Sequence, residues 1–326
     1  MRVAVIGAGV MGLTTALALR EQGADVEILE RSASLAAEAC SRFAGGMLAP
    51  WCEGESAEPL VVRLGQEALD YWPRHVPAER LGSLVLAQRR DAPELDRFAR
   101  RTDRFERLDE AALGELEPDL AGRFARALFF REEGHLDPRE TLKLLAAKLE
   151  AAGVPIRFGV DADANAPAAD RIVDCRGLAA QDRLPDLRGV KGEMLILRCP
   201  DVSVSRPVRL LHPRFPLYIV PRGGGVYMVG ATSIESGERS RVTARSMVEL
   251  LNAAYALHPA FAEAEILEIG SDARPAFPDN LPRIRRDGDR LMVNGLYRHG
   301  FLLSPALARM AADIVMNDVS FPEVTR

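Results

Sequence analysis

The first thirty residues constrain the fold most, because they place three glycines at a fixed spacing between two apolar runs. The run 3–6 leads into the pattern G-x-G-x-x-G at positions 7–12, and a second apolar run, 26–29, ends at Glu30. The stretch between the glycines and the second run is typical of a helix. Strand, glycine turn, helix, strand and acid in this order predict a βαβ unit that binds an adenine dinucleotide.

Each glycine of this pattern has a physical reason. Gly7 permits a tight turn, Gly9 lets the backbone approach a pyrophosphate, and Gly12 lets helix and strand pack closely. The helix N-terminus offers free N–H groups and partial positive charge to the phosphates. Glu30 stands where an acid accepts hydrogen bonds from ribose hydroxyls. The cofactor contacts expected in this unit are Gly7, Gly9, Val10, Met11, Gly12, Glu30 and Arg31.

Other interpretations of the N-terminus have less support. Small-residue helix packing can produce the glycine spacing by chance, but the flanking strands and the acid favour the dinucleotide site. An apolar N-terminus is also typical of a signal peptide or a membrane helix. Here three glycines interrupt the stretch, no small-residue cleavage site follows, and residues 3–19 are too few to span a bilayer. We therefore expect neither export nor a membrane span.

Composition narrows the class of protein further. The length of 326 residues suggests two domains, and the net charge of −5 argues against a nucleic-acid partner. Arginines recur between positions 97 and 107 with acids among them, a spacing that predicts a solvated helix with ion pairs. Four cysteines and five histidines show no metal-ligand spacing. These features predict no metal site and reduced thiols in a cytoplasmic protein.

The pattern of elements predicts a nucleotide domain made of three segments, 1–75, 135–188 and 285–326. A second, α+β domain, 76–134 and 189–284, is inserted twice. This organisation defines the predicted fold class, a Rossmann-like α/β domain with an inserted domain built on an antiparallel sheet.

Local signals support this organisation. An amphipathic helix is expected over 138–152, with Asp137 as its N-cap. Antiparallel structure is expected from Lys191 onward, including a hairpin of strands 217–221 and 226–230 around a glycine turn.

Two glycine-containing segments point to a flat ligand. Gly45 and Gly46 lie among small and apolar residues, which suits either close passage of the backbone beside an apolar ring or an ordinary loop. Near the C-terminus, the turn 294–304 feeds a helix expected over 305–317. A helix N-terminus stabilises negative charge that develops on a reduced flavin ring. This arrangement favours FAD over a nicotinamide cofactor.

The order of several short segments along the chain resembles that of a known family. Six segments carry the resemblance in addition to the N-terminal fingerprint: AGGMLAP (44–50), GHLDP (134–138), YIVPR (218–222), VGAT (229–232), RP with PDNLP (274–282) and YRHG (297–300). Their order is similar to that of the D-amino-acid oxidase family of flavoproteins, and within it to the glycine oxidases of thiamine biosynthesis. The resemblance covers nearly the whole chain.

The resemblance implies roles for individual residues. Arg274 would hold the substrate carboxylate, Tyr218 would donate a further hydrogen bond to it, and Arg298 would lie at the edge of the flavin. A planar guanidinium binds a carboxylate bidentately and so orients the substrate as well as attracting it. The cofactor contacts expected around the ring and beyond it are Ser41, Gly45, Gly46, Met47, Leu48, Val160, Gly177, His299, Gly300, Phe301 and Leu302.

Each substrate residue also has a structural alternative. Arg274, which we expect in a proline-flanked loop, could pair with Asp272 or Asp279 at the surface. Tyr218 could simply pack. Arg298 is costly to bury alone, so a ligand or a carboxylate is expected beside it.

Other residues carry less functional weight. His299 is expected to be a turn residue rather than a base, and Cys40 and Cys175 are expected to pack. No cysteine lies near Arg274 in the sequence, so FAD is expected to bind without a covalent bond. The chain departs from the glycine oxidase pattern at Arg42, Phe43, Pro216 and Ser233, which leaves the size of the substrate pocket open.

The implied activity is FAD-dependent oxidation of glycine or a similarly small amino acid. Oxygen would be the acceptor, and the products would be an imine or glyoxylate, ammonia and hydrogen peroxide. A link to thiazole formation implies a thiazole synthase as partner, and assembly into a homo-oligomer is left open. One alternative is a dehydrogenase of D-amino acids or N-methyl amino acids that reduces a quinone or a protein. Another is a flavin-binding sensor without turnover.

Overall fold

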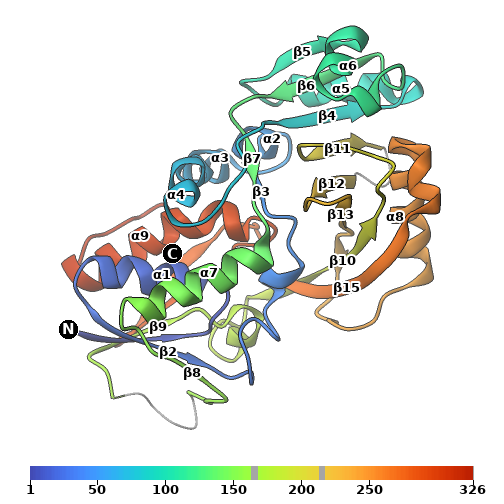
Figure 1. Cartoon of the computed structure of the whole chain (residues 1–326). Coiled ribbons are helices and arrows are strands. Elements are labelled where there is room, and N and C mark those ends of the chain that lie inside the picture. The colour runs from blue at the N-terminus through green and yellow to red at the C-terminus, as the bar shows by residue number, and fades with distance from the viewer. Residues whose placement is uncertain (163–167, 213–216, 326) are drawn as a thin grey trace.

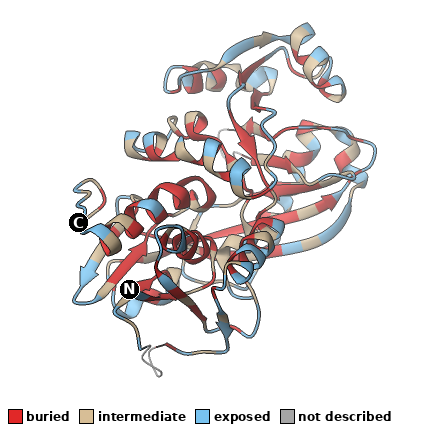
Figure 2. Cartoon of the chain, turned by 60° about the vertical axis from the view of Figure 1, so that its left-hand side comes forward, coloured by how far each residue is buried: buried red, intermediate tan, exposed pale blue. Residues whose placement is uncertain are grey.

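The computed structural model describes residues 1–162, 168–212 and 217–325, and these residues form two lobes, each built on one large β-sheet (Figure 1). A small two-stranded sheet, β3 (Met47–Leu48) with β7 (Gly134–His135), lies where the lobes meet. Figure 2 shows that buried residues line the inner faces of the elements in both lobes.

The first lobe contains a six-stranded sheet that is parallel except at one edge. Its strands, in spatial order, are β16 (Arg283–Asp287), β17 (Arg290–Asn294), β9 (Arg171–Asp174), β1 (Arg2–Ile6), β2 (Asp25–Glu30) and β8 (Ile156–Phe158). Only β16 runs antiparallel to its neighbour. The sheet therefore grows outward from the βαβ unit of the N-terminus, in which α1 (Val10–Glu21) connects β1 with β2.

Apolar helices cover this sheet and form the larger core. Helices α1, α7 (Pro138–Ala151) and α9 (Gly300–Asn317) lie side by side (Figure 1), and α3 (Pro59–Gly65) and α4 (Glu67–His75) pack against α9. Their side chains join those of β1 and β2 in one buried cluster that includes Val5, Leu13 and Leu307.

The second lobe contains a nine-stranded, mainly antiparallel sheet. Its strands along the main path are β14 (Ile234–Glu235), β10 (Arg188–Arg198), β13 (Val226–Gly230), β12 (Leu217–Pro221), β11 (Val208–Leu211), β4 (Ser83–Ala87), β6 (Arg126–Phe130) and β5 (Glu106–Asp109). The long strand β15 (Glu265–Ala276) pairs with β10, and β11 and β4 form the one parallel pair of this sheet in the described residues. The helices of this lobe are α5 (Ala92–Ala99), α6 (Glu110–Leu116) and α8 (Ala244–Leu257), while α2 (Pro50–Glu53) packs against α3.

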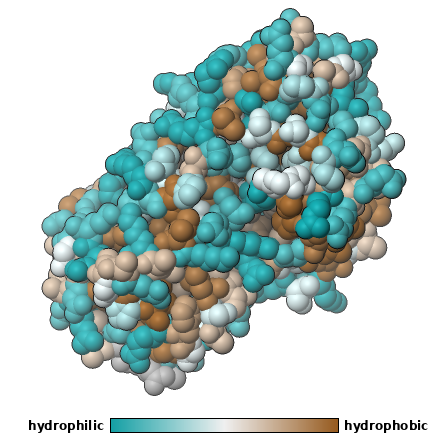
Figure 3. All heavy atoms as spheres, in the orientation of Figure 1, coloured by the Kyte–Doolittle hydropathy of each residue, from teal (hydrophilic) through white to brown (hydrophobic). Residues whose placement is uncertain are grey.

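Short 3-10 helices complete the fold. They are η1 (Cys40–Phe43), η2 (Arg89–Asp91), η3 (Pro118–Leu120), η4 (Gly177–Asp182) and η5 (Pro259–Glu263). Figure 3 shows hydrophilic residues over much of one face of the molecule, with apolar residues gathered in patches on both lobes. Within the described residues, no helix combines the length and apolar character that crossing a membrane requires.

The predicted fold class is confirmed: a parallel α/β sheet that begins with the glycine fingerprint, and a separate, mostly antiparallel sheet. The hairpin of β12 and β13 has the predicted bounds. Asp137 caps α7 as expected, because its carboxylate accepts hydrogen bonds from the backbone N–H groups of Arg139 at 2.8 Å and Glu140 at 3.0 Å. The residue boundaries between the two domains stay a prediction.

The C-terminal helix was predicted to begin at Pro305, and this is wrong: α9 begins at Gly300 and contains Pro305. Proline lacks an N–H group and would leave the carbonyl four residues earlier without its helical partner. That carbonyl belongs to Phe301, and the indole Nε1–H of Trp72 donates to it at 2.8 Å. A side chain from α4 thus supplies the bond that the proline cannot make.

The arginine-rich segment 97–107 is only partly the predicted helix. Helix α5 ends at Ala99, and the arginines that follow lie in a turn and on β5. The expected ion pairs are present, for example Arg97 with Glu94 at 2.7 Å and Arg104 with Glu132 at 3.3 Å. A surface ion-pair network therefore accounts for these charges.

Candidate cofactor and substrate site

Two cavities of about 250 Å³ each adjoin one another between the lobes. Five residues line both of them: Val10, Cys40, Ser41, Tyr297 and Gly300. The first cavity reaches over the nine-stranded sheet, and the second lies at the βαβ unit. Together they form one elongated site with chemically different ends.

The glycine fingerprint shapes the second cavity. Gly7 has a φ of +100°, which only glycine adopts readily, and a Cβ on Gly12 would lie 1.8 Å from the carbonyl oxygen of Gly7. These two glycines therefore make the tight turn and the close helix–strand contact that were predicted. A Cβ on Gly9 would meet nothing closer than the Ser41 hydroxyl, at 3.5 Å, so Gly9 leaves its surroundings open to a ligand.

Glu30 is held in place at the same end. Its carboxylate accepts hydrogen bonds from the backbone N–H groups of Ala8 at 2.7 Å and Ser32 at 2.8 Å. The Ser41 hydroxyl accepts one from the first N–H of α1, that of Val10, at 3.2 Å. An open glycine turn, a helix N-terminus and a fixed carboxylate fit the pyrophosphate and ribose of an adenine dinucleotide.

Most of the predicted cofactor contacts line one cavity or the other. The exceptions are Gly12, which packs α1 against the turn, and Leu48, which is 1% exposed in the core. Residues that the sequence interpretation missed include Ala39, Ala162, Arg176 and Asn294, which reach the cavity from four separate segments.

The two adjacent glycines of segment 44–50 have protein neighbours that explain them. A Cβ on Gly45 would lie 2.7 Å from the ring of Tyr218, and one on Gly46 would lie 2.2 Å from the carbonyl oxygen of Leu136. Arg222 also holds this segment, because its guanidinium donates to the carbonyl of Gly45 at 2.9 Å. The glycines let the backbone pass close to protein groups while it lines the first cavity, where the flavin ring is expected and which is called the ring end below.

Helix α9 points its first turn into the first cavity, which Gly300, Phe301 and Leu302 line. His299 occupies the N-cap position and also lines the cavity. Burial lowers the pKa of His299 to about 4, so its imidazole is neutral near pH 7. The helix N-terminus and this uncharged cap are available to stabilise negative charge on a bound ring.

Arg274 lies on β15 rather than in the loop that the sequence suggested. Its Nη1 donates to the carbonyl of Thr232 at 3.2 Å, and its guanidinium lies over Gly192, where a Cβ would stand 2.1 Å from Nη2. Neither of the carboxylates proposed as surface partners pairs with it. Asp272 binds Arg239 at 2.6 Å, and Asp279 binds Arg283 at 3.0 Å. Within the described residues, Arg274 therefore has no carboxylate partner and faces the cavity.

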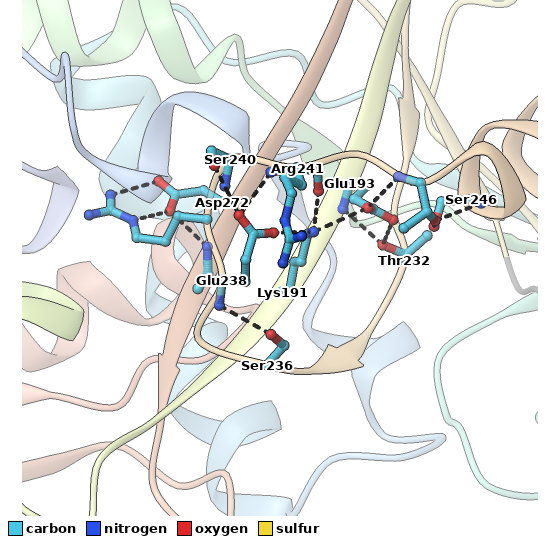
Figure 4. Close-up of polar contacts among 12 residues, drawn as sticks. Lys191, Glu193, Thr232, Ser236, Glu238, Ser240, Arg241, Ser246 and Asp272 are labelled. Atoms are coloured by element: carbon cyan, nitrogen blue, oxygen red, sulfur yellow. Dashed lines mark hydrogen bonds and ion pairs between the residues drawn. The ribbon is translucent and has the colours of Figure 1, made fainter.

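A polar network fixes the loop that supplies Thr232 (Figure 4). The Thr232 hydroxyl accepts from the backbone N–H of Glu193 at 2.9 Å and donates to the Glu193 carboxylate at 3.2 Å. Lys191, which is 5% exposed, pairs with Glu193 at 3.4 Å and with Glu238 at 2.5 Å. Lys191 and Glu193 both lie on β10, so the network fixes the loop that carries Thr232 relative to the sheet. The Thr232 carbonyl, which accepts from Arg274, therefore holds the guanidinium at a defined place above the sheet.

Tyr218 and Arg274 share one face of the nine-stranded sheet. Tyr218 is the cross-strand partner of Gly230, which in turn is paired with Met194 on β10. A Cβ on Gly230 would lie 3.2 Å from the Tyr218 hydroxyl, so this hydroxyl lies over the glycine. Glycines at positions 192 and 230 thus leave room for both polar side chains on the cavity side.

Glu53 is the functional candidate that sequence reasoning missed. Its carboxylate pairs with Arg298 at 3.0 Å, with Arg209 through a short contact, and approaches Nδ1 of His299 at 3.5 Å. Burial alone would raise the pKa of Glu53, but Arg209 and Arg298 together hold it well below its ordinary value. The carboxylate expected beside Arg298 is therefore Glu53, from α2.

The residues at which the chain departs from the glycine oxidase pattern do not all lie at the cavity. Phe43 and Ser233 line the first cavity, whereas Arg42 is exposed outside it. Pro216 lies outside the described residues. No cysteine is near Arg274 in the sequence, as stated above, but Cys40 lies close enough in space for Arg274 to influence its thiol. Burial raises the pKa of Cys40 to about 12, so the group is a neutral thiol.

A family model described as "FAD dependent oxidoreductase", DAO, matches residues 2–314, nearly the whole chain. The chain belongs to the DAO family of FAD-dependent oxidoreductases. The predicted resemblance is therefore confirmed, and FAD is the cofactor of the elongated site.

Individual relatives of this DAO-family chain agree. It is 56% identical over 325 residues to a putative thiamine biosynthesis oxidoreductase ThiO of Rhizobium etli, covering 99% of both chains. It is 27% identical to a bifunctional protein ThiO/ThiG of a Nostoc species, of which it spans 53%. Its fold matches the crystal structure of glycine oxidase from Geobacillus kaustophilus with a TM-score of 0.83 and 25% identity, covering 100% of this chain and 98% of the other.

Proposed function

We propose that the protein oxidises glycine or a similarly small amino acid, with oxygen as the electron acceptor. The products are the imine or its hydrolysis product glyoxylate, ammonia and hydrogen peroxide. The observation that carries the proposal is the position of Arg274, which faces the ring end of the site without a carboxylate partner among the described residues.

The chain's own residues bind and orient the substrate. Arg274 offers a planar pair of donors to the substrate carboxylate, and Tyr218 lies on the same face to donate a further hydrogen bond. Two fixed contacts to one carboxylate restrict the rotation of a small amino acid. Such positioning accounts for a large part of the rate of a reaction that needs one correctly directed hydrogen.

Charge in the cavity also prepares the amine. Arg274 and Arg298 both line it, and nearby positive charge lowers the pKa of a bound ammonium group. A neutral amine then needs no side-chain base, and His299, whose pKa burial lowers to about 4, would be a weak one. FAD, when bound, supplies the redox chemistry by accepting a hydride and passing electrons on to oxygen.

Two relatives support a role in making the thiazole of thiamine. The Rhizobium etli relative is named for thiamine biosynthesis, and the Nostoc relative combines ThiO and ThiG in one chain. We extend this to a thiazole synthase as partner, which would receive the reactive imine or glyoxylate. A purified pair of proteins that fails to associate or to transfer product would refute this extension and leave the oxidase proposal intact.

The test is anaerobic addition of glycine to the purified, FAD-loaded protein while the flavin absorbance is followed, and then admission of air. We expect bleaching in glycine and recovery in air with release of hydrogen peroxide. Bleaching without recovery would instead establish a dehydrogenase with another acceptor. A flavin that no small amino acid reduces would leave the non-catalytic sensor as the remaining interpretation.

A further inference from the structure

We propose that Arg222 is a positioning residue for the flavin ring. It fixes the backbone of residues 44–46 so that two N–H groups point at the ring, and its charge strengthens them as donors. Arg222 does not line the first cavity, so it acts on the cofactor through two peptide groups. This role goes beyond the proposed function, because it concerns the reactivity of the cofactor and not the identity of the substrate.

Arg222 is a largely buried arginine that binds main-chain carbonyls from two other segments. It directly follows β12, and its side chain is only 9% exposed. Nη2 donates to the carbonyl oxygens of Gly45 at 2.9 Å and Ala44 at 3.4 Å, and Nη1 donates to that of Leu136 at 3.2 Å. The guanidinium therefore ties the second lobe to both segments that lead into the small two-stranded sheet between the lobes.

The charge of Arg222 is balanced only in part. Within the described residues, one carboxylate pairs with it, that of Asp137, whose Oδ2 lies 3.6 Å from Nε. This side chain is 41% exposed, and its other oxygen already caps α7. Burial lowers the pKa of Arg222 to about 10, so the guanidinium still carries its charge at neutral pH. An exposed carboxylate is screened by water, and the carbonyl oxygens supply the remaining stabilisation of this charge.

The planarity of the peptide group decides where the neighbouring N–H groups point. In a trans peptide the C=O bond and the following N–H bond lie in one plane and point in opposite directions. The carbonyls of Ala44 and Gly45 point at Arg222, so the N–H groups of Gly45 and Gly46 point away from it. Both glycines line the first cavity, whereas Arg222 does not, and the two N–H groups accordingly face the ring end.

These two N–H groups have no acceptor within the described residues. Gly45 and Gly46 are both buried, yet neither N–H donates to a described backbone or side-chain group. The segment is nevertheless held, because the carbonyl of Gly46 accepts from the N–H of Leu136 at 2.9 Å. Buried backbone donors without an acceptor are rare and cost free energy. The carbonyl oxygens and ring nitrogens of a flavin are acceptors, so a ring in this cavity satisfies both donors.

The charge of Arg222 reaches the ring through the same two peptide groups. Each is a dipole whose oxygen contacts the guanidinium and whose N–H faces the cavity. A cation at the oxygen end polarises the peptide and strengthens the N–H as a donor. Donors that are fixed in advance where negative charge develops stabilise that charge far more than mobile groups do. A flavin gains negative charge when it is reduced or when a nucleophile adds to it, and Arg222 favours both changes.

A purely structural role for Arg222 makes a different prediction. If the guanidinium only held the two lobes together, its loss would lower stability and the affinity for FAD. The ring of those molecules that still carry FAD would then react as in the wild type. The reactivity of the bound flavin therefore separates the two roles.

The experiment is spectrophotometric titration of the FAD-loaded protein with sulfite. The sulfur lone pair forms a bond to N5 of the oxidised ring, the ring takes up the negative charge, and the visible absorbance bleaches. We expect Arg222→Met to raise the Kd for sulfite about tenfold. Removal of one fixed donor in comparable sites costs a factor of about 100 to 1,000, and here the donors are released rather than removed. A Kd within about threefold of the wild type, or a wild-type protein that forms no adduct, would overturn the proposal.

Two variants serve as rescue and control. Arg222→Lys keeps the positive charge near the same carbonyls and should restore most of the sulfite affinity. Arg123→Met is the matched control, because Arg123 also donates to a main-chain carbonyl of a distant segment, that of Leu257 at 3.0 Å, and lines neither cavity. Its Kd for sulfite should equal that of the wild type. An equal loss in Arg123→Met would show a general loosening of the fold and would refute the role of Arg222.

Asp137→Asn tests the charge in the opposite direction and leaves Arg222 in place. Asparagine is also a good N-cap, so α7 keeps its start, while the partial counter-charge of Arg222 is lost. We expect sulfite to bind about two- to fivefold more tightly, the size of effect that a partly exposed ion pair gives. An unchanged or higher Kd would overturn the proposal. This variant and Arg222→Lys carry the test if Arg222→Met does not retain FAD.

Anaerobic reduction by glycine separates this proposal from the proposed function. In Arg222→Met the maximal rate of flavin reduction should fall more than the affinity for glycine, because Arg274 still binds the carboxylate. If glycine reduces the wild-type flavin but Arg222→Met leaves the Kd for sulfite unchanged, the role of Arg222 is refuted and the oxidase stands. If no amino acid reduces the flavin while Arg222→Met weakens sulfite binding, the proposed oxidase function fails by itself.

Discussion

Replacement of Gly192 by alanine tests the assignment of Arg274 without touching that arginine. An added Cβ would lie 2.1 Å from Nη2, 2.4 Å from Cζ and 2.6 Å from Nη1 of Arg274. The φ of Gly192 is not in the left-handed region, so alanine fits the backbone of β10. The guanidinium is the part that must move, because it is the far end of a flexible side chain.

The size of the movement sets the expected effect. An ordinary contact requires at least about 3.4 Å, so Nη2 must shift by more than 1 Å and weaken its neighbour's bond to the carbonyl of Thr232. Misplacement of a substrate by about 1 Å can reduce a rate about a hundredfold. We therefore expect kcat/KM for glycine to fall by a factor of about 10 to 100, which corresponds to about 1.4 to 2.7 kcal/mol.

Steady-state oxygen uptake with glycine measures this loss, and thermal unfolding of the FAD-loaded protein shows whether the fold is intact. Gly237→Ala is a matched control. Gly237 lies between Ser236 and Glu238 of the polar network in Figure 4, and a Cβ there would meet nothing within 4 Å. Unchanged kinetics in Gly192→Ala, with FAD bound and the unfolding temperature retained, would show that Arg274 does not hold the substrate in the position described.

Three further predictions concern buried polar groups. Glu53→Gln should lower the free energy of unfolding by about 2 kcal/mol, because Arg209 and Arg298 lose their shared counter-charge while remaining partly exposed; an unchanged denaturation midpoint would contradict this. Glu133→Gln should gain stability relative to the wild type as the pH rises from 5 to 8. Burial raises the pKa of Glu133 to about 7, so the folded protein keeps a proton that the unfolded chain releases. The free energy of unfolding of the wild type therefore falls over this window, whereas that of the glutamine variant lacks this dependence. Urea denaturation at several pH values checks the sign, and a gain that shrinks with rising pH would refute it. Trp72→Phe should destabilise the protein by about 1 to 3 kcal/mol, because the Phe301 carbonyl loses its donor. The loss should be smaller in a Pro305→Ala background, where the restored backbone N–H donates to that carbonyl instead. Additive effects in this double-mutant cycle would show that the indole does not replace the missing backbone bond.

Local patterns predicted the parts of the fold that local physics decides. The glycine spacing between two apolar runs specified the βαβ unit, since a tight turn, an open helix start and close helix–strand packing each need glycine at one position. The hairpin of β12 and β13 followed from alternating residues around Gly223, Gly224 and Gly225, all of which have positive φ.

Proline misled the prediction at two places, for different reasons. Pro275 and Pro278 suggested a loop around Arg274, but β15 continues through Pro275, because within the described residues β15 pairs only with β10 and an edge strand tolerates a missing N–H. Pro305 suggested a helix start, but Trp72 satisfies the carbonyl that the proline leaves free. In each case a distant part of the chain decides whether the proline ends the element.

The charged cluster could not be predicted, because its members are far apart in the sequence. Glu53 and Arg209 are separated by 156 residues, and Glu53 and Arg298 by 245. None of them stands in a periodic pattern that marks it as buried. Their pairing depends on α2, β11 and the start of α9 meeting at one cavity, which only the folded chain shows.

The interleaving of the cavity walls limits how the protein can be divided. Residues 44–47 and 297–302 line the ring end, yet the chain enters and leaves the second lobe between them. Neither lobe, cut out and produced alone, would contain a complete flavin site. FAD consequently stabilises the contact between the two lobes. Each lobe has its full affinity for FAD only when the other lobe is in place, so loss of FAD and separation of the lobes are coupled events.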